Sequence, residues 1–306
     1  TLFPYTTLFR SILVTGANGQ LGNEVRELSS QYTDYEFVFT DVAELDITNI
    51  NSLNQFFQSQ PKFDFLINCA AYTAVDAAES NQELAFKLNT TAIDMIVEMA
   101  GKYGFFLIQI STDYVFDGEK NRPYDEEDVP IPSSIYGKTK CDAEHLILYS
   151  DINAIVIRTA WLYSTYGKNF VKSMIKYGFE RDELNVVFDQ VGTPTYARDL
   201  ANAILQILPQ LQAQPKPYTD LFHYTNEGVC SWYDFAQHIF RHEGINCRVN
   251  PIRSEQYPTP AKRPAFSVLD KSKIKSKFNI TIPYWTDSLD AMLKKLKTET
   301  LNCIMG

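Results

Sequence analysis

The sequence predicts an α/β protein: a doubly wound parallel sheet with a smaller, mixed α/β C-terminal domain. Three observations support this fold class. Short, nearly continuous apolar runs alternate with amphipathic segments from residue 12 onwards, which is typical of parallel strands covered by helices on both faces. A glycine-rich turn, residues 16–22, joins the first apolar run to the first amphipathic segment. The spacing of apolar residues becomes irregular and prolines cluster after about residue 165, so we expect a second domain there.

The elements of the predicted sheet follow in order along the chain. The predicted strands are the apolar runs 12–14, 37–39, 65–67, 105–110 and 154–157. The predicted helices, which repeat apolar residues three or four positions apart, cover 21–28, 50–57, 85–100 and 136–148. Right-handed crossovers between such strands give a doubly wound sheet, whose ligands bind outside the carboxyl ends of the strands. A strand-like segment at about 219–226 is expected to return to this sheet.

Composition and charge narrow the class of protein. The 306 residues suffice for one large or two modest domains, and 45% hydrophobic with 21% charged residues is a globular composition. No apolar run approaches the roughly 18 residues that a membrane helix needs, so we expect no membrane partner. The net charge of −9 argues against nucleic acid as a partner. Five cysteines without a CxxC pair predict free thiols in a reducing compartment, and therefore a cytoplasmic protein.

The glycine-rich turn predicts a nucleotide site. Glycines at 16, 19 and 22 permit a tight turn and a close approach of the backbone to a pyrophosphate, while the helix that follows offers free N–H groups. Asp41, at the end of the second predicted strand, can accept hydrogen bonds from an adenosine ribose. These features indicate a Rossmann dinucleotide-binding domain; a plain strand–helix turn is the alternative. The Asp41 carboxylate would repel a 2′-phosphate, which favours NADH over NADPH.

The order of the chain then gives the domain organisation. Residues 1–11, TLFPYTTLFRS, show neither the helical nor the strand periodicity of apolar residues. They back-translate codon by codon into a sequencing-adapter oligonucleotide. We interpret them as a non-native leader, with a natural apolar leader as the alternative. Residues 12–165 are expected to form the dinucleotide-binding domain, and residues 166–300 mainly a substrate-binding domain.

A Tyr–Lys pair suggests acid–base chemistry. Tyr136 and Lys140 lie four residues apart, on one face of a predicted helix. A nearby ammonium lowers the pKa of a phenol from its usual value of about 10. Thr112 follows the fourth predicted strand, where its hydroxyl can bond a substrate carbonyl oxygen. The pair alone is common on solvated helices, so its position near Thr112 is what favours catalysis.

Together these motifs resemble the extended short-chain dehydrogenase/reductase superfamily and, more closely, the dTDP-4-dehydrorhamnose reductase family. The resemblance runs from about Ile12 to about Leu289. Besides the glycine motif, it is carried by residues 68–76, 111–118, 136–140, 158–163, 189–195 and 257–264, together with Glu79, Asn89 and Glu144.

The resemblance implies reduction of the 4-keto group of dTDP-4-dehydro-L-rhamnose by NADPH or NADH, the last step of dTDP-rhamnose biosynthesis. It implies that Tyr136 donates the proton, that Lys140 holds the nicotinamide ribose and lowers the phenol's pKa, and that Thr112 binds the keto oxygen. The substrate-binding residues that it implies are Thr112, Asp113, Trp161 and Arg263. The cofactor-binding residues that it implies are Gly16, Gly19, Gln20, Leu21, Gly22, Asp41, Asp46, Ile47, Ala70, Ala71, Tyr72, Thr73, Asn89, Tyr136 and Lys140.

Other hypotheses about the function, the metal content and the oligomeric state stay open at this point. The family resemblance also implies Mg²⁺ at a dimer contact, with no ligands assigned, and a monomer or a homodimer. One alternative function is a non-catalytic nucleotide-binding subunit resembling the regulatory subunit of methionine adenosyltransferase. Another is a related sugar-nucleotide ketoreductase, epimerase or dehydratase. The presence of Thr112, Tyr136 and Lys140 favours a reductase over the regulatory subunit. Tyr114 argues against a dehydratase, which would carry Glu at this position.

Overall fold

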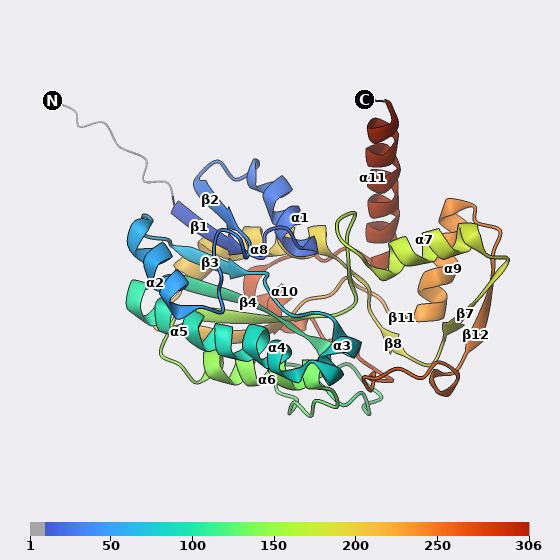
Figure 1. Ribbon diagram of the computed structural model, residues 1–306, viewed down its shortest axis with the longest axis horizontal. Helices are drawn as coiled ribbons and strands as arrows, with labels where there is room; N and C mark the ends of the chain where they lie inside the picture. The colour runs from blue at the N-terminus through green and yellow to red at the C-terminus, as the bar shows by residue number, and fades with distance from the viewer. Residues whose placement is uncertain (1–9, 306) are drawn as a thin grey trace.

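A six-stranded parallel sheet forms the centre of the computed structural model, which describes residues 10–305 (Figure 1). The strand order is β10-β5-β4-β3-β1-β2, and each neighbouring pair is parallel. The strands are β1 (Arg10–Thr15), β2 (Tyr35–Thr40), β3 (Phe65–Asn68), β4 (Phe106–Thr112), β5 (Ala154–Thr159) and β10 (Thr219–His223). The predicted fold class is confirmed.

Helices cover both faces of the sheet because alternate strand residues point to opposite sides. Ile12 and Val14 pack against one group of helices, whereas Leu13 packs against the other. The first face carries α1 (Gln20–Ser29), α8 (Ala197–Gln212) and α10 (Ser272–Phe278). The second face carries α2 (Ile50–Ser59), α5 (Ala92–Tyr103) and α6 (Ile135–Leu148). Burial on both faces explains why the strands read as continuous apolar runs.

The strand order places a switch point at β1, which lies between β2 and β3. The chain leaves β1 toward one edge of the sheet and returns at β3 to build toward the other. A crevice therefore opens between the loops that follow β1 and β3, and this is where doubly wound sheets bind their ligands.

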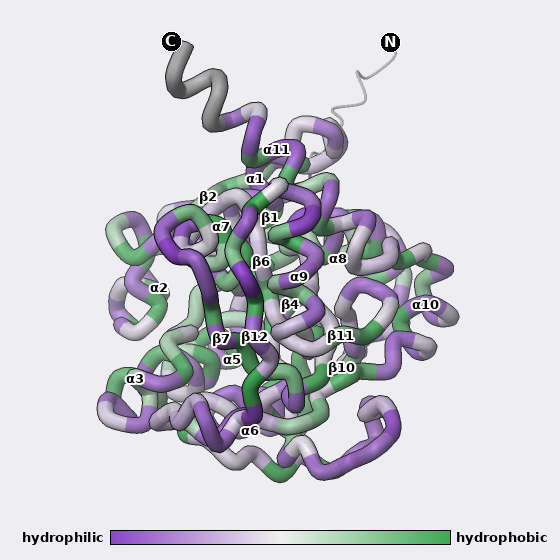
Figure 2. Tube along the Cα trace, turned by 90° about the vertical axis from the view of Figure 1, so that its right-hand side faces the viewer, coloured by the Kyte–Doolittle hydropathy of each residue, from purple (hydrophilic) through white to green (hydrophobic). Residues whose placement is uncertain are grey.

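The smaller domain packs around its own core. A two-stranded parallel sheet of β7 (Glu183–Val187) and β12 (Arg248–Ile252) joins three helices in one hydrophobic cluster. These helices are α7 (Phe170–Glu180), α9 (Trp232–Glu243) and α11 (Trp285–Met305). Figure 2 faces this domain, and apolar and polar residues alternate along its helices, as expected for helices with one buried side.

Short elements complete the described chain. They are α3 (Val75–Ser80), α4 (Gln82–Phe86), a π-helical turn (Lys87–Thr91), two 3₁₀ turns (Asp113–Val115 and Ser254–Gln256), β6 (Leu162–Tyr163), β8 (Val191–Gly192), β9 (Thr195–Tyr196) and β11 (Cys230–Ser231). No helix within residues 10–305 has both the length and the apolar character to cross a membrane.

The first strand begins earlier than the sequence predicts. Arg10 and Ser11, which the sequence assigns to the leader, pair with Tyr35 and Glu36 as the first two residues of β1. Strand pairing uses backbone groups, which any residue supplies, so it continues past the apolar run. The rest of the predicted leader, residues 1–9, lies outside the described residues. The segment expected to return to the sheet forms β10, beside β5.

Candidate active site

Two of the three glycines in the turn after β1 are required by close packing. At Gly16, where φ is +63°, a Cβ atom would lie 2.5 Å from the backbone nitrogen of Ala70. At Gly22 a Cβ atom would lie 2.5 Å from the carbonyl oxygen of Gly16. Gly19 differs, because a Cβ atom there would meet only the Gly16 carbonyl oxygen, at 3.2 Å, and because Gly19 lines both cavities of the crevice. The loop is thus held tightly by its outer glycines and presents backbone to a ligand at Gly19.

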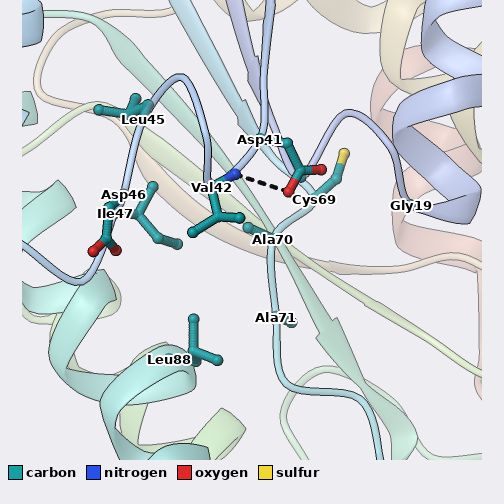
Figure 3. Close-up of a pocket in the computed structure, with 11 residues that line it drawn as sticks. Gly19, Asp41, Val42, Leu45, Asp46, Ile47, Cys69, Ala70, Ala71 and Leu88 are labelled. Carbon is teal, nitrogen blue, oxygen red and sulfur yellow. Dashed lines mark hydrogen bonds between the residues drawn. The ribbon is translucent and has the colours of Figure 1, made fainter.

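One end of the crevice is a cavity between the glycine turn and the loop after β2 (Figure 3). The Asp41 carboxylate accepts hydrogen bonds from the backbone nitrogens of Asn18, at 3.0 Å, and Val42, at 2.8 Å. It therefore fixes the glycine turn and places a negative charge at this end. The lining comprises Gly16, Gly19, Asp41, Val42, Leu45, Asp46, Ile47, Cys69, Ala70, Ala71 and Leu88. Val42, Leu45 and Leu88 were not anticipated from the sequence, because each is an isolated apolar residue outside the motifs; Cys69 lies in the motif 68–76 but was not assigned to the cofactor site.

Asn89 supports the wall of this cavity from behind. Its side-chain oxygen accepts from the Tyr72 nitrogen at 2.8 Å, and its amide nitrogen donates to the Tyr72 carbonyl at 3.1 Å and to the Thr139 hydroxyl at 3.0 Å. The side chain is buried and lies in the π-helical turn. Its hydrogen bonds hold the loop after β3 rather than face the crevice. Neither Asn89 nor Tyr72 belongs to the cavity linings.

The other end of the crevice is a cavity of about 630 Å³ that brings the predicted catalytic residues together. Thr112 ends β4, while Tyr136 and Lys140 come from the first turns of α6. Ser134 caps that helix by accepting from the Gly137 nitrogen at 3.1 Å, which fixes the first turn. Predicted residues in the lining are Gly19, Gln20, Leu21, Ala70, Ala71, Thr73, Thr112, Asp113, Tyr136, Lys140 and Trp161.

The phenol of Tyr136 is buried in this cavity, and burial controls its pKa. Burial raises the pKa of its phenol to about 12; a hydrogen bond with Thr112 opposes this shift and the charge of Asp113 adds to it. Burial outweighs the other contributions, and Lys140 is not among the causes of this shift, so the lowering of the pKa by Lys140 stays a prediction. Thr112 in turn donates to the Asp113 carboxylate at 3.1 Å. At neutral pH the phenol is protonated.

Lys140 is buried beside the same cavity. Its ammonium donates to the Ile110 carbonyl at 2.6 Å. Burial lowers the pKa of Lys140 to about 8, and the negative charge of Glu144, one helical turn away, raises it. The Lys140 ammonium therefore loses its proton at a pH only slightly above neutral.

A buried ion pair lies beneath the predicted catalytic residues and joins α6 to β5. The Arg158 guanidinium contacts Glu144 at 2.6 Å, with side chains only 2% and 1% exposed. Ser111, just before Thr112, donates to the same carboxylate. Burial and the Arg158 charge lower the pKa of His223, beside this pair, to about 3, so the imidazole is neutral. The pair fixes the strand and helix that carry the site.

Trp161 forms part of the wall facing the smaller domain. Its backbone has φ of +49°, a strained value for a bulky side chain. Its ring stacks on Trp232 of α9, with centroids 3.6 Å apart and planes 10° apart. Trp232 was not anticipated, because in the sequence it reads only as part of an amphipathic helix.

The remaining predicted residues lie outside the cavity linings. Arg263 pairs with Asp76 at 2.9 Å and is absent from the lining. Gly22 packs under the glycine turn. Among the side chains that the structure describes, residues 10–299, no three His, Cys, Asp or Glu side chains are grouped to hold a metal ion, so we assign no Mg²⁺ ligands.

The doubly wound sheet, the glycine turn at its switch point, and Thr112, Tyr136 and Lys140 at the carboxyl edge define an extended short-chain dehydrogenase/reductase. The chain belongs to the family described as RmlD substrate binding domain, whose model matches residues 10–298.

Relatives and solved structures agree with this assignment. The chain is 39% identical to the dTDP-4-dehydrorhamnose reductase of Aggregatibacter actinomycetemcomitans, covering 91% of this chain and 96% of the relative. A crystal structure of the Clostridium acetobutylicum reductase has a TM-score of 0.87 at 43% identity, covering 94% of this chain and 99% of that chain. The Bacillus anthracis reductase, solved in complex with NADP, has a TM-score of 0.88 at 35% identity, covering 94% and 100%.

Proposed function

We propose that this protein reduces the 4-keto group of dTDP-4-dehydro-L-rhamnose to give dTDP-L-rhamnose, using NADPH or NADH. The observation that carries the proposal is the convergence of Thr112, Tyr136 and Lys140 in one cavity that is continuous in its lining with the glycine turn. The similarity to reductases named for this reaction, over nearly the whole chain, supports the substrate assignment.

The crevice fits a nicotinamide dinucleotide. Gly19 offers the backbone groups of the α1 N-terminus to a pyrophosphate, and Asp41 faces the adenosine end. Ala71 and Lys140 lie toward the catalytic end. A nicotinamide cofactor supplies hydride to the substrate carbonyl carbon when it is bound.

The side chains of this protein stabilise the negative charge that forms on the substrate and donate the proton. Negative charge develops on the keto oxygen, and the hydroxyls of Thr112 and Tyr136 stabilise it by hydrogen bonding. Tyr136 donates its proton to that oxygen, because its raised pKa keeps the phenol protonated until charge appears. Lys140 binds cofactor hydroxyls through its ammonium, and Asp113 and Trp161 contact the sugar nucleotide.

The test is direct incubation of the purified protein with dTDP-4-dehydro-L-rhamnose and each reduced nicotinamide. We expect loss of reduced-cofactor absorbance and formation of dTDP-L-rhamnose, identified by chromatography against a standard. dTDP-glucose, which lacks the keto group, is the matched control and should give no oxidation. Cofactor binding without any turnover would contradict the proposal and favour the regulatory-subunit alternative.

A further inference from the structure

A short segment of the smaller domain is fixed to the helix that follows the glycine turn. We call residues 162–169 the strap; it runs from β6 toward α7. Gln20, at the start of α1, donates to the Leu162 carbonyl at 3.4 Å and accepts from the Asn169 amide at 3.0 Å. Ser164 donates to Glu24 at 2.6 Å. The strap is therefore attached to α1 at both of its ends and in between.

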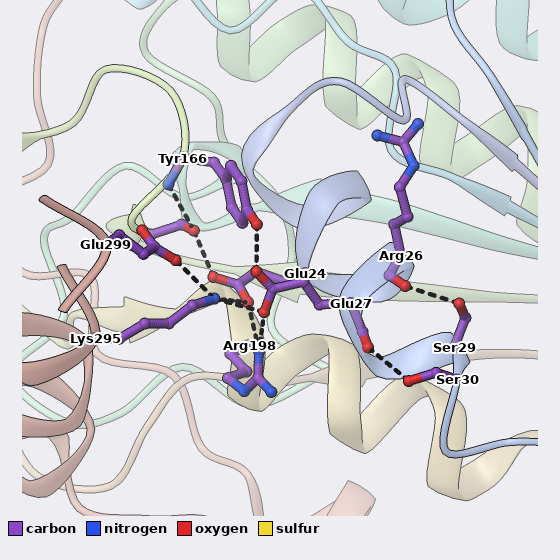
Figure 4. Close-up of polar contacts among 10 residues, drawn as sticks. Glu24, Arg26, Glu27, Ser29, Ser30, Tyr166, Arg198, Lys295 and Glu299 are labelled. Carbon is purple, nitrogen blue, oxygen red and sulfur yellow. Dashed lines mark hydrogen bonds and ion pairs between the residues drawn. The ribbon is translucent and has the colours of Figure 1, made fainter. Parts of the chain in front are cut away.

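The attachment is reinforced by a cluster of ion pairs (Figure 4). Glu24, with a fully buried side chain, and Glu27 both point from α1 toward two cations. Arg198 of α8 contacts Glu24 at 3.2 Å and Glu27 at 2.5 Å, and Lys295 of α11 contacts Glu27 at 2.6 Å. The Tyr166 hydroxyl donates to Glu27. Because three helices share this cluster, the strap and α1 are expected to move as one unit.

The strap presents one cation to the crevice. Gly167 and Lys168 line the same cavity as Gly19 and Gln20. Gly167 has φ of +65°, and a Cβ atom there would lie 3.1 Å from the Gln20 side chain, so the turn passes close to the start of α1. Among the described residues, the exposed Lys168 ammonium has neither a hydrogen bond nor an ion pair, unlike the anchored side chains around it.

The charge of the crevice explains why such a cation matters. The two cavity linings carry three carboxylates, those of Asp41, Asp46 and Asp113. Their only cations, within the described chain, are Lys140 and Lys168. Lys140 lies at the catalytic end and bonds the backbone of β4. A dinucleotide adds the two negative charges of its pyrophosphate, and Lys168 is the cation near the glycine turn.

We infer that Lys168 binds the diphosphate of the nicotinamide cofactor, from the side opposite the glycine turn. The inference rests on the proposed function. A diphosphate is also present in the dTDP-sugar, and the same cavity lining holds Asp113 and Trp161. The cofactor is favoured because both neighbours of Lys168 lie against the start of α1: a Cβ atom on Gly167 would be 3.1 Å from the Gln20 side chain, and Asn169 bonds Gln20 at 3.0 Å. Rigid attachment of the strap to α1 means that the two diphosphate-binding elements keep their spacing without an ordering step when ligand binds.

The experiment compares Lys168→Gln with Lys168→Arg and with Lys176→Gln, a matched loss of one exposed charge on α7. The Kd values of NADPH, NADH, ADP-ribose and dTDP are measured by calorimetry without sugar substrate, at low and high salt. We expect Lys168→Gln to weaken both nicotinamides and ADP-ribose about tenfold, as for one partly solvated charge-assisted hydrogen bond. The cofactor Kd of Lys168→Gln should also rise less between low and high salt than the Kd of the wild type does. Lys168→Arg should restore affinity, and Lys176→Gln should not change it.

Two outcomes would overturn the inference. One is unchanged cofactor and ADP-ribose affinity in a folded Lys168→Gln protein. The other is weaker dTDP binding with unchanged cofactor binding, which would assign the lysine to the substrate's diphosphate. A wild-type protein that binds cofactor but does not reduce the sugar would instead refute the proposed function, so the two failures are distinguishable.

Discussion

Replacing Tyr136 with Phe removes one oxygen and leaves the packing of the ring. The ring meets Tyr114 edge to face, with centroids 5.6 Å apart, and packs with Ala78 and Ala85. Phe keeps these contacts, so the fold should survive. The hydroxyl's bond with Thr112 is lost, which we expect to cost about 1 kcal/mol of unfolding free energy.

The effect on turnover should be much larger. The raised pKa of about 12 means that Tyr136 is protonated at neutral pH and supplies the proton directly. Ser111 already donates to Glu144, and Lys140 donates to the β4 backbone, so neither group is free to replace Tyr136 as the proton donor. General acid catalysis contributes roughly 10²–10⁴ in rate, which corresponds to about 3–5 kcal/mol of transition-state stabilisation.

The assay measures kcat and cofactor Kd for both proteins between about pH 6 and 10. We expect kcat to fall by that factor while cofactor Kd changes little, because Tyr136 contributes little to the pyrophosphate and adenosine contacts. Tyr124→Phe is the matched control, since its buried hydroxyl bonds Asp117 outside the cavity. Near wild-type turnover by Tyr136→Phe would refute the acid assignment.

Three further predictions concern charge. Cofactor affinity should weaken as pH rises through about 8, where Lys140 loses its proton; Glu144→Gln should move this transition to lower pH, because Glu144 raises that pKa. A pH-independent Kd would contradict this role. Arg158→Met leaves the buried Glu144 carboxylate unpaired and should lower the free energy of unfolding, measured with urea, by about 3–5 kcal/mol. Arg248→Met, which breaks the exposed pair with Glu183, should not shift the urea midpoint. If the Arg158→Met protein unfolded at the same urea midpoint as the wild type, the buried pair would not have this importance. Asp41→Ala should weaken both cofactors by releasing the glycine turn, yet raise the ratio of NADPH to NADH affinity; an unchanged ratio would reject charge repulsion as the basis of selectivity.

The sheet was predictable because its signal is local. Strand residues that are buried on both faces of a sheet are mostly apolar, as residues 65–67 of β3 and 154–157 of β5 show. The buried polar residues of these strands, Asn68, Arg158 and Thr159, stand at their carboxyl ends. The position of Thr112 at the carboxyl end of β4 followed from the same reasoning. The start of β1 was missed because backbone pairing at Arg10 and Ser11 requires no apolar side chain.

The environment of the site was less predictable because it depends on distant packing. Spacing placed Tyr136 and Lys140 on one helical face, but the depth of burial that controls their pKa values arises from several elements. The stack of Trp161 on Trp232 joins residues of different domains. Lys168 resembles any solvated lysine until the strap places it at the crevice.

The return of β10 to the sheet has a consequence during synthesis on the ribosome. β5 is buried along its whole length, and one of its two partners, β10, begins about 60 residues later. At about 5–20 residues per second, translation takes roughly 3–12 s to make that partner. Throughout this interval the nascent chain carries an apolar strand with an open edge, which is a site for association with other chains. We therefore expect the growing polypeptide to be most prone to aggregation, and most dependent on chaperones, between the emergence of β5 and that of β10.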